Sequence, residues 1–242
     1  MRRLRRWIGA AIALPLLLVA GLLLWAMLGA KPQDLPWTPL DLSQPVGLFT
    51  GRKLAGLTRD FPRCRALLDR AGIRYTALAE VREGQCGYGD GVRLDPGGSR
   101  QIGFVPSGVG MACPVAAALA LWEWDVIQPA AFRHFGVRVT GIEHFGSYNC
   151  RRIYGRSAGP WSEHATADAF DVAGFRLADG REVSVLRDWP GKGPKPAFLR
   201  EVRDGACRLY ATVLSPDYNA AHANHLHLDQ AARGEMGWRM CR

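Results

Sequence analysis

Lysine is scarce in this sequence, which contains only Lys31, Lys53, Lys192 and Lys195, so its positive charge comes almost entirely from arginine. Acidic residues are absent before Asp34, while four arginines lie within the first six positions. Subtracting these four from the formal net charge of +9 leaves an excess of +5. No expected helix carries a concentrated basic stripe, which argues against a nucleic-acid-binding protein. An excess of this size still suits an anionic polymer as a partner.

The sequence also lacks internal repeats, Ser-Pro tracts and any C-x-x-C pair. The missing C-x-x-C pair argues against a zinc ribbon and against a thioredoxin-like redox site. The apolar fraction of 48% and the charged fraction of 22% are ordinary, which excludes fully disordered, collagen-like and coiled-coil chains. A chain of 242 residues therefore has room for one large domain or two small ones.

The N-terminus joins the arginine cluster to a long uncharged segment. Residues 8–30 contain no charged side chain, and a helix needs about 20 apolar residues to cross a bilayer. The apolar region of a cleaved signal peptide is usually shorter, about 7–15 residues. We therefore expect residues 1–30 to form an uncleaved transmembrane signal anchor, with cleavage after Ala30 as the alternative. The arginines would then stay in the cytoplasm, and everything after Lys31 would lie outside.

Six cysteines follow this segment, and an even number beyond an anchor fits three disulfides in an oxidising compartment. Fifteen pairings are possible for six cysteines, and the sequence does not choose among them. Six buried free thiols are the alternative. The cysteines therefore predict a compartment outside the cytoplasm, and they are Cys64, Cys86, Cys113, Cys150, Cys207 and Cys241.

After the anchor, the sequence divides into a proline-containing segment and one domain. Pro32, Pro36, Pro39 and Pro45 exclude long regular elements, so residues 31–60 are expected to form an extended linker. Residues 61–242 are expected to form an α+β domain, with a small, mainly antiparallel sheet flanked by helices.

Apolar spacing predicts helices within that domain over residues 62–71, 114–127 and 196–214. Pro129 is expected to end or kink the second helix. Alternating patterns predict strands over 75–81 and 137–141, a hairpin over 169–185, and a last strand over 224–229. Residues 84–110 are rich in glycine and aspartate, which favours short strands within irregular loops.

Three of the six histidines fall in one short segment, His222-Ala-Asn-His225-Leu-His227. His225 and His227 are two positions apart, so on a strand their side chains share one face. Upstream, His164 precedes Asp171 by seven residues, with the expected start of a strand between them. Two histidines and one carboxylate form the three-ligand set of a catalytic zinc, which keeps a fourth position for water. Such a zinc acidifies the water and polarises a carbonyl.

These two segments resemble the LAS metallopeptidases, a group that includes lysostaphin, VanY-type D-Ala-D-Ala carboxypeptidases and hedgehog proteins. The usual motif of the group is S-x-H-x-x-G-x-A-x-D with a later H-x-H or E-x-x-H. Residues 61–242, with their cysteines and the Gly-Ser-Tyr-Asn-Cys-Arg run at 146–151, resemble the bacterial extensin-like C-terminal family, which is grouped with these peptidases by resemblance. The match is carried by Ser162-x-His164-x-x-Ala167-x-Ala169-x-Asp171 and by His225-x-His227.

Carried over position by position, the resemblance makes His164, Asp171 and His227 the zinc ligands and implies a LAS-like fold. His225 matches a position that faces the active site and helps to stabilise the transition state. His222 adds an H-x-x-H-x-H pattern similar to that of the penicillin-insensitive murein endopeptidases. The resemblance therefore places His225 and His222 among the candidate catalytic residues.

Arg151 resembles the arginine of a G-Y-R-S segment that precedes the first ligand in the group. It would hold a substrate carboxylate or carbonyl oxygen, although Arg152 is an alternative for this role. Asp229 would either orient a ring nitrogen of a ligand histidine or be an exposed acid at a strand end. The remaining polar residues near the motifs are interpreted as structural, namely Glu143, His144 and the capping residue Ser162.

The sequence departs from the usual motif at two positions. Ala167 stands where glycine is usual, which is a mild change. Asn224 stands three residues before the last ligand, where the E-x-x-H subgroup carries its general base. The departure at Asn224 puts turnover in question more than metal binding, and it leaves the role of base to His225, His222 or Glu163.

The leading hypothesis is a zinc-dependent peptidase anchored in the bacterial inner membrane, with its domain in the periplasm and peptidoglycan stem peptides as substrate. A catalytically silent zinc-containing module that binds wall peptides or a protein is the second hypothesis. A structural envelope protein held by disulfides is the third. Neither the bond that would be cleaved nor the oligomeric state follows from the sequence.

Overall fold

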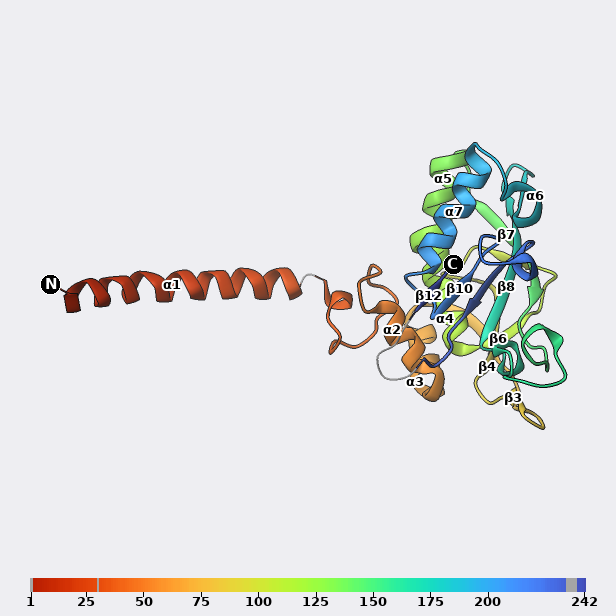
Figure 1. The fold of residues 1–242 in the computed structure, drawn as a ribbon, viewed down its shortest axis with the longest axis horizontal. Coiled ribbons are helices and arrows are strands. Elements are labelled where there is room, and N and C mark those ends of the chain that lie inside the picture. The colour runs from red at the N-terminus through yellow and green to blue at the C-terminus, as the bar shows by residue number, and fades with distance from the viewer. Residues whose placement is uncertain (1, 30, 234–238) are drawn as a thin grey trace.

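The computed structural model describes residues 2–29, 31–233 and 239–242. Helix α1 (Arg2–Gly29) extends away from the rest of the chain (Figure 1). Apolar side chains on it, such as Leu17 and Trp25, are exposed. Within the part of the chain that the structure describes, no helix is both long and apolar enough to cross a membrane. The transmembrane prediction is thus not confirmed, and Met1 and Ala30 of the predicted anchor lie outside the described residues.

The segment expected to be an extended linker packs on the domain instead. It contains η1 (Pro32–Asp34), α2 (Thr50–Ala55) and η2 (Gly56–Arg59), which are short, as its prolines require. Leu40, Leu42, Leu54 and Leu57 are all buried in the hydrophobic core. Each fully buried leucine contributes about 1.5–3 kcal/mol, which outweighs the tendency of this segment to stay extended.

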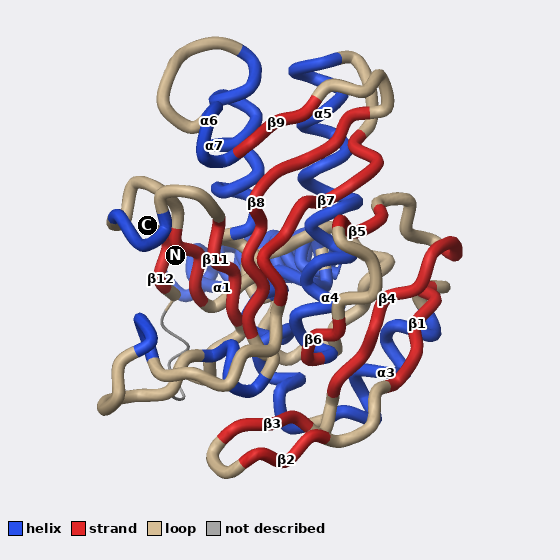
Figure 2. Tube along the Cα trace, turned by 90° about the vertical axis from the view of Figure 1, so that its right-hand side faces the viewer, coloured by secondary structure: helices blue, strands red, loops and turns tan. Residues whose placement is uncertain are grey.

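The main sheet has seven strands, in the order β12-β10-β11-β8-β7-β5 with β9 paired to β8 (Figure 2). Two of its pairs are parallel, β5 with β7 and β10 with β12, and the others are antiparallel. The α+β prediction with a mainly antiparallel sheet is therefore confirmed. The strands are β5 (Gly103–Val105), β7 (Val139–Gly146), β8 (Ala169–Leu177), β9 (Glu182–Ser184), β10 (Thr212–Leu214), β11 (Leu226–Asp229) and β12 (Met240–Cys241).

Strand β8 forms the centre of this sheet and has two differently used faces. Phe170 and Val172 are fully buried in the core. Because successive side chains of a strand alternate, Asp171 points to the opposite face. The register between β7 and β8 shifts at three places, the last of them just before the Gly146–Asp171 pair. On its other side Asp171 pairs with His227 of β11 in a regular antiparallel ladder.

Helix α4 (Cys113–Trp122) packs against the core side of the sheet, and all ten of its residues are buried. Trp122 contacts Phe175 of β8 and Tyr210 edge-on, at centroid distances of 5.9 and 6.5 Å. A π-helical turn (Glu123–Ile127) follows, and α5 (Gln128–Phe135) then continues with Pro129 in its first turn. Pro129 was expected to end or kink the helix, and in the structure the helix changes locally to a π-helical turn. Proline has no N–H to donate, and this change of helix type accommodates the missing hydrogen bond.

Two other helices largely follow their patterns. Helix α3 (Phe61–Arg70) confirms the first predicted helix, and Asp60 caps it by accepting a hydrogen bond from the backbone of Arg63. Helix α7 (Pro194–Ala206) ends earlier than predicted, because residues 212–214 form β10 rather than a last helical turn. The hairpin prediction over 169–185 is confirmed by β8 and β9, and α6 (Val185–Asp188) follows it.

Two smaller sheets lie beside the main one. The first contains β1 (Ile73–Ala77), β4 (Gly91–Gly98) and β6 (Gly110–Ala112), and the second pairs β2 (Val81–Glu83) with β3 (Cys86–Tyr88). These short strands confirm the irregular character expected for residues 84–110. All six cysteines form disulfides, as predicted, and their pairing is Cys64–Cys113, Cys86–Cys150 and Cys207–Cys241.

Candidate metal centre

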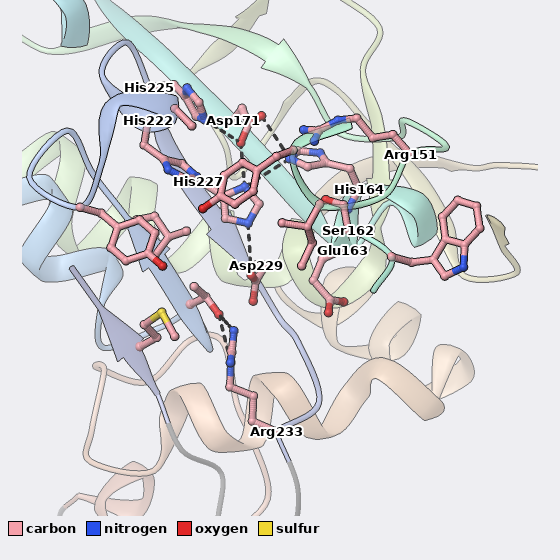
Figure 3. Close-up of a pocket in the computed structure, with 18 residues that line it drawn as sticks. Arg151, Ser162, Glu163, His164, Asp171, His222, His225, His227, Asp229 and Arg233 are labelled. Carbon is pink, nitrogen blue, oxygen red and sulfur yellow. Dashed lines mark hydrogen bonds and ion pairs between the residues drawn. The ribbon is translucent and has the colours of Figure 1, made fainter. Parts of the chain in front are cut away.

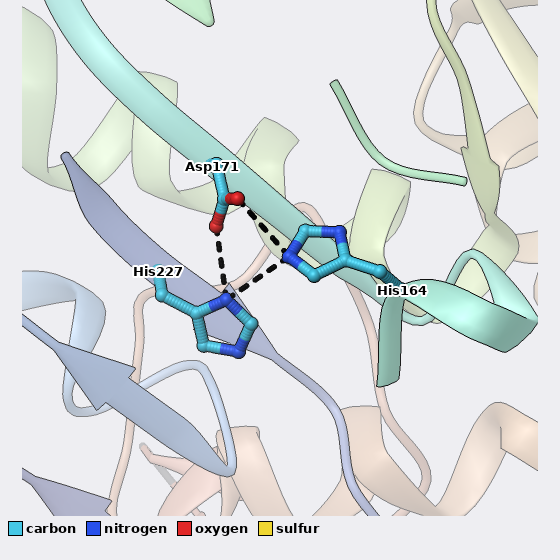
Figure 4. A group of neighbouring side chains, drawn as sticks. All are labelled: His164, Asp171 and His227. Atoms are coloured by element: carbon cyan, nitrogen blue, oxygen red, sulfur yellow. Dashed lines mark hydrogen bonds and ion pairs between the residues drawn. The ribbon is translucent and has the colours of Figure 1, made fainter. Parts of the chain in front are cut away.

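Three predicted ligands, His164, Asp171 and His227, converge on the face of the sheet to which Asp171 points (Figure 4). Asp171 of β8 and His227 of β11 are direct partners in the antiparallel ladder, and His164 reaches them from η5 (Glu163–Thr166). His164 Nε2 lies 3.1 Å from Asp171 Oδ2 and 3.2 Å from His227 Nδ1. His227 Nδ1 lies 2.9 Å from Asp171 Oδ1. These residues, called here the candidate metal triad, could hold a metal ion.

The spacing of the triad fits a tetrahedral metal. With metal–ligand bonds of about 2.0–2.1 Å, two ligands of a tetrahedral zinc lie about 3.3 Å apart. The two ring nitrogens lie 3.2 Å apart, and they lie 2.9 and 3.1 Å from the two separate oxygens of Asp171, all close to that value. Two imidazoles and one carboxylate are also a donor set that zinc accepts. The residues present therefore fit a zinc ion.

Hydrogen bonds outside the triad determine which ring nitrogens are free to bind a metal. A backbone carbonyl can only accept, so His164 Nδ1 donates to the carbonyl oxygen of Ser147 at 2.6 Å. His227 Nε2 donates to Oδ2 of Asp229 at 3.2 Å. The lone pairs of His164 Nε2 and His227 Nδ1 consequently face Asp171, as metal ligation requires.

The electrostatics of the triad show that it attracts a cation. Burial raises the pKa of Asp171, but hydrogen bonds from His164 and His227 outweigh it, and the pKa lies well below its ordinary value. Burial lowers the pKa of His227, but hydrogen bonds to Asp171 and Asp229 raise it to about 9. The metal-free protein thus holds a proton on His227 Nδ1, where a metal would replace it.

The loop before β8 holds His164 rigidly. Ser162 caps η5 by accepting a hydrogen bond from the backbone of His164, which agrees with its interpretation as a capping residue. Ala167 ends η5 in the left-handed region, with φ of +56°. Glycine adopts this conformation without strain, whereas alanine adopts it only at some cost. The carbonyl of Ala167 also accepts a hydrogen bond from Ser147 Oγ.

A pocket of about 640 Å³ opens beside the triad, and Figure 3 shows the side chains that line it. His225 and His222 both lie in it, with ring centroids 5.2 Å apart. His225 precedes β11, and its Nε2 lies 3.5 Å from Asp171 Oδ1. His222 ends η6 (Ala220–His222), with its ring centroid 5.9 Å from that of His227. The pocket thus contains both candidate catalytic histidines.

Both of these histidines are kept neutral at pH 7. Burial lowers the pKa of His225, although the charge of Asp171 opposes it. Burial, together with the charges of His225 and His227, lowers the pKa of His222 to about 4. A neutral imidazole has one lone pair and can accept a proton, as a general base must.

Arg151 lies in the same pocket, and no acidic group of the described residues is within ion-pair distance of its guanidinium. Arg152 instead stacks on Trp161, with Cζ 4.4 Å from the ring centroid, and does not line the pocket. Arg151, rather than Arg152, thus lines the pocket beside the candidate metal triad. Glu163 also lines the pocket, and burial followed by the charge of Asp229 raises its pKa.

The other residues discussed from the sequence have identifiable contacts. Asp229 is buried and hydrogen-bonded to His227, so it orients a ring nitrogen and is not an exposed acid. Glu143 forms an ion pair with Arg176 at 2.8 Å, and His144 Nε2 hydrogen-bonds to the carbonyl of Pro106 at 2.8 Å. Neither lines the pocket, which agrees with their structural interpretation.

Sequence reasoning missed several contributors to the site. Ser147 acts through its backbone carbonyl, which has no sequence signal at all. Tyr154, Asn219 and Arg233 line or support the pocket from separate segments. A positive φ of +57° at Tyr154, a bulky residue, marks backbone strain that is often found at functional sites. That signal is visible in the structure and absent from the sequence.

Comparisons with known proteins identify the family. The sequence model of the family described as "Extensin-like protein C-terminus" matches residues 62–242, which is most of the chain. No match to a curated protein or to a solved structure was found. The resemblance to the LAS metallopeptidases therefore stays a prediction that is based on the motifs. The chain belongs to the extensin-like C-terminal family.

Proposed function

We propose that this protein is a zinc metallopeptidase of the bacterial cell envelope that cleaves peptidoglycan peptides. One observation carries the proposal. The candidate metal triad converges beside a pocket of about 640 Å³, with outer hydrogen bonds that aim His164 Nε2 and His227 Nδ1 at Asp171. A structural site would gain nothing from an adjacent pocket, whereas a catalytic site needs room for substrate and water.

His164, Asp171 and His227 would hold the zinc ion. When bound there, zinc would supply a Lewis acid that polarises a peptide carbonyl and acidifies water. The residues of the chain would do the rest. A neutral histidine, His222 or His225, would accept a proton from the attacking water and pass it to the leaving amine. The guanidinium of Arg151, which lines the pocket, would bind a carboxylate or carbonyl oxygen of the substrate.

The substrate class is supported by charge and by the motif. The excess of positive charge and the position of Arg151 in the pocket suit an anionic peptide. Stem peptides of peptidoglycan carry free carboxylates, and the LAS-like motif is typical of enzymes that cut them. This substrate class is consequently the one that we propose.

The proposed location is the periplasmic face of the inner membrane. An arginine cluster forms the start of α1, and the described side chains of its later, apolar part are exposed. Three disulfides follow in the domain, and such bonds persist in oxidising compartments. We propose that α1 anchors the protein and that the arginines remain in the cytoplasm.

A catalytically silent zinc module is the second candidate, and Asn224 favours it. The amide oxygen of Asn224 accepts a hydrogen bond from His225 Nδ1 at 2.8 Å, and an amide cannot serve as a general base. Such a module would use the same pocket to bind wall peptides without cutting them.

The deciding experiment uses the purified full chain in mild detergent, with its zinc content measured by mass spectrometry and a mixture of muropeptides as substrate. We expect one zinc per chain and cleavage of at least one muropeptide. His225→Ala should keep zinc but lower kcat by about 100-fold or more. A protein with full zinc that leaves every muropeptide uncut would contradict the enzyme, and a zinc-free protein would favour the structural alternative.

A further inference from the structure

Two histidines face the pocket, and their surroundings differ in how firmly the ring proton is placed. His222 Nδ1 lies 2.8 Å from Asn219 Oδ1, and His225 Nδ1 lies 2.8 Å from Asn224 Oδ1. An asparagine side chain can rotate by 180° and exchange its oxygen for its nitrogen, which would reverse the tautomer of the histidine beside it. The placement of the ring proton therefore depends on what else each asparagine contacts.

Asn219 cannot rotate without losing the hydrogen bond that its oxygen accepts from a backbone N–H group, while a tyrosine hydroxyl, which can accept or donate, holds the other end of the amide in place. Its Oδ1 also accepts from the backbone N–H of Ala221 at 3.1 Å, as the cap of η6. Its Nδ2 donates to Tyr154 Oη at 3.0 Å. Rotation would place the amide NH2 group against the N–H of Ala221. Oδ1 consequently faces His222, so His222 Nδ1 carries the proton.

The other ring nitrogen of His222 is then a free acceptor. Among the residues that the structure describes, none hydrogen-bonds to His222 Nε2, and the ring lies against His225 and His227 (Figure 3). His225 differs, because its Nε2 faces Oδ1 of Asp171 at 3.5 Å, and within the described ranges no second side-chain hydrogen bond orients Asn224. The pocket thus offers one histidine lone pair that is not directed at a carboxylate.

Tyr154 is the far end of this chain of contacts, and its backbone is strained. It has φ of +57° and ψ of 23°, a left-handed conformation that costs a bulky residue about 1–2 kcal/mol. This conformation belongs to η4 (Ile153–Gly155), beside the backbone bridge between Arg152 and Trp161. Strain of this kind persists where surrounding contacts require it.

We propose that Tyr154 and Asn219 form a positioning relay that makes His222 Nε2 the proton acceptor of the site. The catalytic step in this inference rests on the proposed function. The tautomer of His222 rests only on the contacts of Asn219. In that step, the attacking water bonds to the carbonyl carbon through its oxygen and gives one proton to His222 Nε2. The proton then passes to the leaving nitrogen as the C–N bond breaks. The products are a carboxyl group and an amine.

The tautomer is measured directly by long-range ¹H–¹⁵N correlation spectra of the full chain, labelled at histidine and held in detergent, with and without zinc. His222→Gln identifies the signals by their loss. We expect a protonated Nδ1 and an unprotonated Nε2 for His222. Asn219→Ala should move the proton largely to Nε2, whereas Asn219→Asp, which keeps an acceptor oxygen, should retain it on Nδ1.

Two tyrosine variants provide matched comparisons in the same spectra. Tyr154→Phe keeps the ring but removes the acceptor of Asn219 Nδ2, so we expect a partial shift of the His222 proton. Tyr218→Phe is the control, because Tyr218 contacts the His222 ring at 5.6 Å but its hydroxyl takes no part in the relay. Its spectrum should match the wild type at His222.

The proposed role of His222 Nε2 as proton acceptor is tested by the steady-state kinetics of muropeptide cleavage by the zinc-loaded variants. Asn219→Ala should lower kcat by about 10–100-fold with KM and zinc content unchanged. An Nε2-protonated His222 in the wild type, or an Asn219→Ala spectrum equal to the wild type, would overturn the relay. A wild-type protein with the expected tautomer and no cleavage would overturn the proposed function and leave the tautomer assignment standing.

Discussion

Arg100 and Glu123 are buried as completely as the candidate metal triad, yet the two groups differ in what their polar atoms face. Glu123 accepts hydrogen bonds from the backbones of Gln101 and Ile102, and it pairs with Arg100 at 2.9 Å. The pair consists of one positive and one negative side chain, and neither lines the pocket. In the triad, two ring lone pairs and a carboxylate converge on one point, and outer partners keep them there.

The comparison shows how a buried charge that serves structure differs from one that serves function. In the Arg100–Glu123 pair the opposite charges compensate one another within the folded chain, and removal of one partner leaves the other charge buried and unpaired. In the triad the ring nitrogens and the carboxylate face one another, so a proton or a metal ion has to lie between them. Burial alone therefore does not identify a site, whereas the direction of the lone pairs does.

The largest effect on stability is expected from Glu123→Gln. The amide keeps an oxygen for the backbone N–H groups of Gln101 and Ile102 but leaves the Arg100 charge without a partner. We expect the free energy of unfolding to fall by about 3–5 kcal/mol, measured by denaturant titration with the disulfides intact.

The control for this variant is Glu143→Gln, which breaks the partly exposed pair with Arg176. Its expected cost is below about 1 kcal/mol. Zinc content should be unchanged in both variants. A loss of zinc in Glu123→Gln would show that the two buried groups are coupled and would end the comparison.

A smaller effect, on metal binding, is expected from Asp229→Asn. This change keeps an oxygen for the backbone of Ala231 but removes the negative charge that receives His227 Nε2–H. We expect zinc affinity to weaken by about 10–100-fold, measured by competition with a chelator. The exposed Asp204→Asn is the matched control. Equal affinities in the two variants would refute the orienting role of Asp229.

The smallest effect concerns Asp168, another buried acidic residue. Its Oδ1 has no hydrogen-bond partner among the described residues. Burial, followed by the charges of Glu163, Asp229 and Asp90, raises its pKa well above 3.8. The folded state therefore holds this proton more tightly than the unfolded state. As the pH rises above about 4, the unfolded state loses the proton first, and Asp168 reduces stability.

Asp168→Asn cannot titrate and should relieve this cost. We expect the variant to gain about 1 kcal/mol over the wild type at pH 7 and little at pH 4, in denaturant titrations of the zinc-free protein. A gain that is the same at both pH values would show that the charge of Asp168 is not the cause. A loss at pH 7 would show that the carboxylate has a partner that stabilises it.

The elements that could be predicted from the sequence depend on short-range patterns. The apolar spacing of α3, the alternation of β8 and β9 and the spacing of His164 and Asp171 are properties of neighbouring residues. Pro129 was expected to end or kink a helix, and a π-helical turn precedes it in the structure. Predictions failed where contacts with distant residues outweigh local preferences. The leucines of residues 31–60 are an example, because they pack into the hydrophobic core of the domain.

The sequence by itself determined which residues have the chemistry of a metal site, because residue type and spacing carry that information. The six cysteines likewise predicted three disulfides. Only the tertiary structure decided how the cysteines pair and which nitrogen of each histidine is free. It also showed that Ser147, Asn219 and Tyr154 support the site. Those properties depend on backbone carbonyls and side chains brought together from distant segments, and no local pattern encodes such contacts.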